Sequence, residues 1–435
     1  MSKDSTYNDF SVSILKTKNK EDTKKDLSFE LKGDQVYGLD KSIINGIRRT
    51  LLVDIDAVAF NDDSIIINTN KSGLHNEFLK HRITLIPLYI DPETYHRNYL
   101  FELKVKVTNE TPVLSITVDM FEIYPLKDEV IDIINEQSDK VVSDEDNMLL
   151  KLNNVSTEYY NLDNPLNDSE KKKIFRPFEF NKMTSYFLLT ELKTTNSEEE
   201  FEEIELYCVP SVGVGKDHSK FNNLPTVTYS FKKNDEAFQK VLKDNIKIHK
   251  IKEKDILAYS KSLELSEGER YYYRDAINEP YWFNFKISSN HFHNSKDIFI
   301  YSINKLLSRF THIENNLIKM ISDPEESLFH IEHLKKDNDL TYKIILSNED
   351  DTTGNMIQTH AVNKFINSES IITILGYKKP HPLTHLIFLN IMIQASTDYS
   401  ESQKLSYIIK FLINVVKDLI GILDIIKTSA DKKLF

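Results

Sequence analysis

Apolar residues recur at helical spacing in four segments of the chain, which follow one another in the order short, long, short, long. The first segment predicts a helix that runs to about Val53, with apolar positions at Leu39, Ile43, Ile47 and Leu51. The second predicts a long helix with a narrow seam made of Phe299, Ile303, Leu306, Phe310, Ile313, Leu317 and Met320. A seam of this length needs another helix to cover it.

The last quarter of the chain repeats this order. Ile357, Ala361 and Phe365 mark a shorter helix, for which Thr352 and Thr353 are the expected caps. A second long helix begins at Ser400 and carries a seam made of Leu405, Ile408, Leu412, Val415, Leu419, Ile422 and Ile426. We expect the two long seams to bury each other, with the two short helices alongside.

Short apolar or alternating runs between these helices predict strands. In the first part of the chain they are Phe10–Lys16, Leu27–Gly33 and Tyr281–Ser288. In the last part they are Thr341–Ser347, Ile371–Tyr377 and Leu386–Ile393. The expected fold class is α+β, with two related modules, each a small sheet with one short and one long helix, packed as an intramolecular pseudo-dimer.

The N-terminal module is expected to be discontinuous. It comprises 1–56 and 276–321, an inserted and mostly β domain fills 57–275, and the C-terminal module is 322–435. Inside the insert, 100–110 and 113–124 predict a hairpin-connected strand pair. Residues 125–173 turn acidic and Asn-rich, which predicts long loops or a partly disordered segment. A short charged linker, 321–339, joins the modules.

Composition narrows the classes of function. At 435 residues and 50.8 kDa the chain exceeds the size of a single core. A formal net charge of −12 argues against a surface that neutralises phosphates, so nucleic acid is expected to be contacted only indirectly. The apolar run 408–426 is interrupted by charged residues, and the N-terminal residues do not resemble a signal peptide, so no membrane association is expected.

Candidate chemical motifs are weak, and no bound cofactor or metal is expected. The single cysteine, Cys208, cannot form an intrachain disulfide or a cysteine-rich zinc site, and it fits a reducing, intracellular compartment. The stretch GVGKDHSK, residues 213–220, lacks the spacing of a phosphate-binding loop. His291 and His293 have no further ligands at zinc spacing. The stretch NEDDTTGN, residues 348–355, lacks the alternating acids of a calcium loop.

Five segments carry a resemblance to a known family. Three of them lie in the first module and the inserted domain: NGIRRTLL (45–52), HNEFLKHRITLIPL (75–88) and VGVGKDHSKF (212–221). These are similar to the third subunit of RNA polymerase II, the archaeal D subunit and, in the first helix, the bacterial alpha subunit. Near the C-terminus, NEDDTTGNMIQ (348–358) and LGYKKPHPLTH (375–385) resemble the eleventh subunit. The zinc-binding cysteines that many relatives carry in the inserted domain have no counterpart here.

The resemblance implies a fused assembly pair: a scaffold without catalytic residues, on which a DNA-directed RNA polymerase is built. The implied partners are the two large catalytic subunits and small subunits of the tenth and twelfth type. The implied subunit-docking residues are Asn45, Arg48, Arg49, Glu77, His81, Arg82, Lys216, His218 and Lys220. An eleventh-subunit-like loop would comprise Gly376, Tyr377, Pro380, His381 and Pro382. The residues expected to pair the modules are Ile303, Leu306, Phe310, Ile313, Leu317, Ile357, Phe365, Leu405, Leu412 and Leu419.

Adjacent positions on a helix point about 100° apart, so at most one of Arg48 and Arg49 fits a buried face. The other can project towards a partner carboxylate. A solvated helix face for both is the alternative.

Fusion of the pair in one chain resembles the arrangement in large DNA viruses that encode their own transcription machinery. That resemblance implies a location in the cytoplasm of infected cells and in the virion, with the nucleus as the alternative.

Two other functions stay open. A free-standing dimerisation adaptor would share the helix seams, but it would have no reason to carry both groups of motifs. An enzyme with its own site would need a convergent set of acids, bases or metal ligands, which the sequence does not supply.

Overall fold

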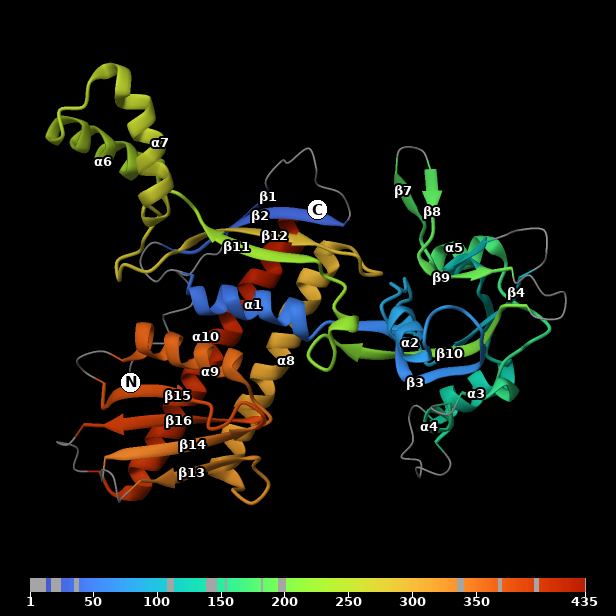
Figure 1. Ribbon diagram of the computed structural model, residues 1–435. Helices are drawn as coiled ribbons and strands as arrows, with labels where there is room; N and C mark the ends of the chain where they lie inside the picture. Colours follow the sequence, from blue (N-terminus) through green and yellow to red (C-terminus); the bar gives the residue numbers. More distant parts are fainter. Residues whose placement is uncertain are drawn as a thin grey trace. The chain divides into compact units, whose positions relative to one another are not determined.

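The computed structural model describes residues 13–16, 25–34, 39–107, 113–137, 147–152, 155–180, 183–194, 201–334, 340–366, 370–394 and 399–434. They form two compact units (Figure 1). The main unit comprises 1–54, 226–289 and 294–435. The insert comprises 55–225 and 290–293.

The first sheet of the main unit is antiparallel and has the order β1-β2-β12-β11. Its strands are β1 (Ser13–Lys16), β2 (Asp26–Lys32), β12 (Trp282–Ser288) and β11 (Thr226–Phe231). The strand predictions are confirmed for the described residues, while residues 10–12 lie outside them. The inner face of the sheet is aromatic, since Phe29 of β2 and Phe285 of β12 contact each other and Phe299 of a helix that packs on the sheet, with ring centroids 4.9 to 6.0 Å apart.

The second sheet of the main unit is also antiparallel and has the order β13-β14-β16-β15. Its strands are β13 (Phe329–His333), β14 (Thr341–Ser347), β16 (Leu386–Ile393) and β15 (Ile372–Lys378). The segment 321–339 was expected to be only a linker, and this is wrong. It contains β13, because Phe329 is buried and the strand pairs with β14 along its length. Residues 335–339 lie outside the described residues.

Four helices of the main unit match the predicted order short, long, short, long. They are α1 (Lys41–Val53), α8 (Ser295–Ser322), α9 (Asp351–His360), which continues as a π-helical turn over Ala361–Phe365, and α10 (Glu401–Lys433). Ser400 begins α10 with a capping box. Thr352 and Thr353 do not cap α9 as expected. Asp350 does, because its carboxylate accepts the N–H groups of both threonines.

The two long helices pack against each other, and α1 packs against α9 (Figure 1). All five predicted α8 residues, as well as Ile357, Leu412 and Leu419, are at most 1% exposed, whereas Phe365 and Leu405 are half-buried. Complete burial of one such side chain contributes about 1.5–3 kcal/mol. The seams therefore form the core of the main unit.

The main unit extends further into the predicted insert than expected. Strand β11 pairs with β12, and it is followed by a helical hairpin made of α6 (Asp235–Ile248) and α7 (Ile256–Glu267). Each hairpin helix buries a single residue, Leu242 or Leu263. The compact insert thus comprises 55–225 and 290–293, whereas the sequence predicts 57–275. The domain boundaries of the fused pair stay a prediction.

The insert is built on an antiparallel sheet of order β3-β10-β4-β6. Its strands are β3 (Asp56–Asn70), β10 (Glu203–Val214), β4 (Tyr99–Lys106) and β6 (Glu122–Pro125). Helix α2 (Asn76–Thr84) contacts β3. Two smaller ladders pair β5 (Val113–Thr117) with β9 (Leu188–Lys193), and β7 (Phe178–Phe180) with β8 (Met183–Ser185).

Two expectations for the insert are wrong in part. The run 113–124 is not one strand, because a 3₁₀ turn over Val118–Met120 divides it into β5, which pairs with β9, and β6, which pairs with β4. The region 125–173 is not only loops. It contains the helices α3 (Asp128–Gln137), α4 (Met148–Lys151) and α5 (Asp168–Ile174). Other 3₁₀ turns are Thr157–Tyr159, Ser219–Phe221, Glu253–Asp255 and Gly268–Arg270.

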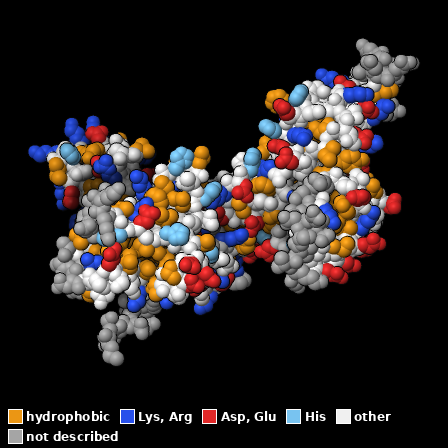
Figure 2. All heavy atoms as spheres, turned by 90° about the horizontal axis from the view of Figure 1, so that it is seen from below, with side chains coloured by type: hydrophobic (Ala, Val, Ile, Leu, Met, Phe, Trp, Pro, Cys, Tyr) orange, Lys and Arg blue, Asp and Glu red, His pale blue; other side chains and the backbone are white. Residues whose placement is uncertain are grey.

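The distribution of charge and the polarity of the helices both bear on function. Acidic and basic side chains are interspersed with apolar ones on the face drawn in Figure 2. That face differs from the continuous basic surface typical of a nucleic-acid-binding protein. None of the helices described by the structure is both long and apolar enough to cross a membrane.

Candidate functional site

The two groups of motifs meet where α1 contacts α9. Gly46 of α1 lies directly against the side chain of Met356, which is completely buried. A Cβ atom at position 46 would overlap the Met356 sulfur, so this helix crossing requires a residue without a side chain or a displaced methionine. The glycine of the first motif is therefore explained by close packing onto the second motif.

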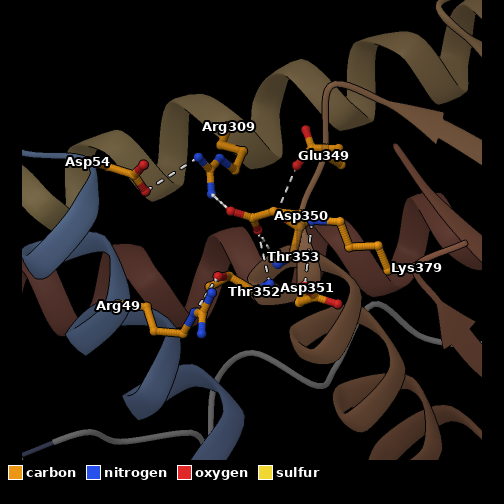
Figure 3. A network of polar contacts seen from close by, with 9 residues as sticks. All are labelled: Arg49, Asp54, Arg309, Glu349, Asp350, Asp351, Thr352, Thr353 and Lys379. Atoms are coloured by element: carbon orange, nitrogen blue, oxygen red, sulfur yellow. Dashed lines mark hydrogen bonds and ion pairs between the residues drawn. The ribbon is translucent and has the colours of Figure 1, made fainter. Parts of the chain in front are cut away.

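The arginine pair of α1 is used inside the chain. Arg49 donates from Nε to the hydroxyl of Thr352 in α9 at 2.9 Å, as Figure 3 shows. Arg48 donates from Nε to Asn45 Oδ1, one turn earlier in α1, at 3.0 Å. Neither arginine is buried, since Arg48 is half-buried and Arg49 is exposed. Both therefore keep hydrogen-bonding capacity towards solvent.

Arg309 of α8 joins the ends of two helices (Figure 3). Its Nη2 lies 3.4 Å from Oδ2 of Asp54, the C-cap residue of α1, and its Nη1 lies 3.7 Å from Oδ2 of Asp350, the N-cap residue of α9. Both carboxylates are largely buried, with side-chain exposures of 14%. Sequence reasoning missed this cluster. The acidic residue after α1 and the arginine on the polar side of the α8 seam were the available signals.

The C-terminal motifs hold α9 against β15. Gly354 allows the Tyr377 ring to approach, since a Cβ atom there would lie 2.7 Å from Tyr377 Cδ2. The backbone N–H of Tyr377 donates to Gln358 Oε1 at 2.8 Å. Asp351 forms a longer ion pair with Lys379 at 3.9 Å. The rest of the predicted loop is solvent-exposed, with Pro380, His381 and Pro382 followed by Leu383 at 82% exposure; Gly376 is half-buried.

A buried charge cluster lies beside this junction, between the end of α9 and α10. Asp418 accepts hydrogen bonds from His360 Nε2 at 2.7 Å and from Lys364 Nζ at 2.6 Å. Burial acts to raise the pKa of Asp418, but these hydrogen bonds outweigh it and lower the pKa below its ordinary value. The ionised carboxylate thus contributes to the stability of the main unit.

In the insert, α2 has a buried apolar side and an exposed side that also carries apolar residues. His75 caps the helix, and Leu79 and Ile83 are buried. On the other side, Phe78 is 65% exposed and Leu85, which follows the helix, is 59% exposed. These two residues are seven positions apart, so they lie on the same side. Two large apolar side chains exposed on one side of a helix make that side a candidate interaction surface. Sequence reasoning noted the motif but did not predict this pair.

The predicted docking residues of the α2 motif surround that pair. Glu77 and His81 are exposed. Arg82 donates from Nη2 to the backbone carbonyl of Leu188 in β9 at 2.5 Å. An open pocket of about 440 Å³ lies beside Arg82, lined by residues that include Leu74, Leu188 and Glu191. The α2 face therefore combines apolar, charged and recessed parts.

The second motif of the insert, 212–221, begins in the last residues of β10 and forms the tight turn that follows. Gly213 is required because a Cβ atom there would lie 2.5 Å from the ring of Phe221. His218 accepts the backbone N–H of Lys220 through Nδ1 at 3.2 Å and thereby caps the following 3₁₀ turn. Lys216 and His218 are exposed, and Lys220 is half-buried with its ammonium over the Phe221 ring. The docking role of these residues stays a prediction.

The cysteine and histidines considered as possible chemical or metal-binding residues are buried or paired within the chain. Cys208 is completely buried, and burial raises the pKa of its thiol well above the ordinary value. Burial also lowers the pKa of His291, whose Nε2 lies 2.8 Å from the Asp56 carbonyl oxygen. The neighbouring His293 lies 3.3 Å from Asp91. No group of three or more potential metal ligands occurs among the residues that the structure describes.

Sequence comparison connects part of the chain to subunits of RNA polymerases. No family model matches it. The chain is 29% identical over 101 residues to the human protein named DNA-directed RNA polymerases I and III subunit RPAC1, a match that covers 20% of the chain and 29% of that protein. The Dictyostelium discoideum protein of the same name is 30% identical over 88 residues, covering 18% of the chain and 25% of that protein. The chain thus spans less than a third of the length of these relatives.

Proposed function

We propose that this protein is a non-catalytic assembly scaffold of a multisubunit DNA-directed RNA polymerase. The observation that carries the proposal is the exposed apolar pair of Phe78 and Leu85 on α2, flanked by Glu77, His81 and Arg82. The partial homology to a polymerase subunit supports a polymerase as the assembly to which this surface belongs.

The proposed architecture is an intramolecular pseudo-dimer of a third-subunit-like and an eleventh-subunit-like module. Support comes from the repetition of one four-stranded sheet, one short helix and one long helix on either side of the α8–α10 packing. The α1–α9 crossing, with Gly46 against Met356, is the corresponding contact of the short helices. Fusion would hold the two modules at an effective concentration on the order of millimolar.

The proposed partners are the two large catalytic subunits and small subunits of the tenth and twelfth type. A partner carboxylate could be bound by the unused N–H groups of Arg48 or Arg49, since each arginine has five donors and the chain engages the Nε of each. In this proposal nucleic acid is contacted only through the large subunits. A viral origin, with assembly in infected cells and packaging in the virion, remains part of the proposal.

Reconstitution with the two large subunits tests this function. We expect a stable complex, detected by size-exclusion chromatography with mass-spectrometric identification of its components. Arg48→Ala and Arg49→Ala should each change the free energy of unfolding by no more than about 1 kcal/mol, because a half-buried or exposed arginine contributes little to stability. If either arginine binds a buried partner carboxylate, its loss should weaken assembly by roughly 2–5 kcal/mol.

The result also separates the alternatives. A chain that never associates with polymerase subunits would contradict the scaffold and favour a free-standing adaptor. Turnover of a substrate by the isolated chain would favour an enzyme. If the double variant of Arg48 and Arg49 assembles as well as the wild type, the arginine pair has no docking role, while the α2 surface stays testable separately.

A further inference from the structure

The edge strand β11 of the main unit has an unusual surface. It is an outer strand of its sheet, and no strand lies on its other side among the described residues. Its sequence, TVTYSF, contains no charged residue and favours extended structure. Exposed edges of this kind pair readily with other chains unless something covers them or charges oppose the pairing.

Two edges of the second sheet are protected by such devices. At β15, the outward N–H of Tyr377 is taken by Gln358 of α9. The β13 edge carries His330, Glu332 and His333, of which Glu332 pairs with Lys343 at 2.6 Å and His333 with Glu401 at 3.0 Å. Neither device occurs on β11.

The register shows which backbone groups of β11 are available. Lys232 donates to the Trp282 carbonyl, and the pairing register runs from Thr226 opposite Ser288 to Phe231 opposite Phe283. Hydrogen-bonded residues alternate in an antiparallel ladder, so the even-numbered residues 226–232 face β12. The N–H and C=O groups of Val227, Tyr229 and Phe231 therefore face the open edge.

A pocket of about 670 Å³ adjoins the C-terminal half of this edge. Its lining includes Tyr229, Phe231, Tyr271, Tyr272 and Asn284. The aromatic residues of this lining include Phe231 and Tyr272, whose ring centroids lie 4.8 Å apart. The pocket is therefore suited to an apolar or aromatic side chain.

The charged residues in the pocket argue against other ligands. Lys232 pairs with Glu30 at 2.7 Å and Lys233 pairs with Glu264 at 3.1 Å, so both ammonium groups are engaged within the chain. Asp235 and Glu269 also line the pocket and would repel phosphates. A polypeptide, unlike a nucleic acid, can both fill the pocket and pair with alternating backbone groups.

We propose that the β11 edge binds an extended segment of another polymerase subunit as a fifth strand, with an apolar side chain in this pocket; this step rests on the assembly function proposed above. Backbone hydrogen bonds would supply the attachment, and the pocket would select the side chain. Side chains alternate along a strand, so the segment should carry apolar residues at every second position on the pocket side.

Hydrogen–deuterium exchange with single-amide resolution tests the proposal. Three samples are compared: the isolated chain, its complex with the two large subunits, and the same complex with the small subunits added. In one of these complexes the amides of Val227, Tyr229 and Phe231 should exchange at least about tenfold more slowly than in the isolated chain. The amides of Thr228 and Ser230 serve as internal controls, because they are bonded to β12 in all samples.

The same experiment separates failure of this step from failure of the scaffold. A complex that forms while the three odd-numbered amides exchange as in the isolated chain would overturn strand addition alone. Absence of any complex would overturn the proposed function. Protection already present in an isolated chain that sediments as a dimer would show a second copy on the edge, which also overturns the proposal.

A pair of variants distinguishes the backbone from the side chain. Tyr229→Pro removes an outward N–H, which an edge strand tolerates, while Tyr229→Ala removes the same ring and keeps the N–H. We expect protection of Phe231 in the complex to fall at least about tenfold further in the proline variant than in the alanine variant. Equal protection in both variants, each with a wild-type melting curve, would contradict pairing at this edge.

Discussion

The α1–α9 junction and the α2 face both consist of residues from the motifs that resemble polymerase subunits. At the junction these residues contact each other, whereas on the α2 face they are exposed to solvent. At the junction, Gly46 packs on Met356 and Arg49 binds Thr352, so the motif residues meet each other inside one unit. On α2, Phe78 and Leu85 face solvent. A motif can therefore mark an internal contact or an external one, and burial distinguishes the two.

The largest effect should come from charging the helix seam. Ile303→Asp should destabilise the main unit by roughly 4 kcal/mol or more, because it places an unpaired charge at a completely buried position of α8, the helix that packs against α10. Ile318→Asp is the matched control, since that residue lies on the same helix and is 42% exposed. Chemical denaturation measures both. Similar, small losses in the two variants would show that the seam is not the core.

Breaking the buried charge cluster should cost somewhat less and depend on pH. Asp418→Asn removes the carboxylate that pairs with His360 and Lys364, at an expected cost of roughly 3 kcal/mol at neutral pH. Because the pKa of Asp418 is lowered in the folded state, its contribution is present above the unfolded pKa near 3.9 and disappears as pH falls through the folded pKa. The free energies of unfolding of the two proteins should therefore approach each other as the pH falls from 7 through the unfolded pKa and below the folded pKa. A constant difference would contradict an ionised Asp418.

A smaller effect should follow from overpacking the junction. Gly46→Val should cost about 1–3 kcal/mol, because its side chain would overlap Met356. Met356→Ala removes the overlapping atoms, so the double variant should be more stable than the sum of the two single changes predicts. Additive free energies of unfolding across this double-mutant cycle would mean that α1 and α9 do not meet at these residues.

The sequence predicted the elements of the main unit better than their connections. Both long helices and the strands β14 and β16 follow directly from apolar periodicity, which burial on one face imposes. Periodicity could not predict that β11 joins the first sheet, because strand pairing is a non-local choice. For the same reason the sequence predicts one strand over 113–124, although this run divides into β5 and β6, which pair with different strands.

The sequence predicts which residues belong to the candidate site, but not which way their side chains point or what they contact. The motif resemblance pointed to Arg48, Arg49 and the α2 residues, whereas the Nε contact of Arg49 depends on where α9 packs. The Arg309 cluster was missed because it joins Asp54 and Asp350, which are far apart in sequence. Phe78 could have been found from the sequence, since an aromatic residue between Glu77 and the buried Leu79 lies off the apolar stripe of α2.

We propose two separate roles: the α2 face binds a partner, and the α1–α9 junction holds the main unit together. Both roles are tested by the double variant Phe78→Ala/Leu85→Ala. The affinity of the two large polymerase subunits for this variant is measured together with the thermal unfolding of the isolated variant. We predict an unchanged melting temperature and an affinity reduced by roughly 2–4 kcal/mol, as expected for loss of central interface residues. Wild-type affinity, or a clear loss of stability in the isolated chain, would contradict the account.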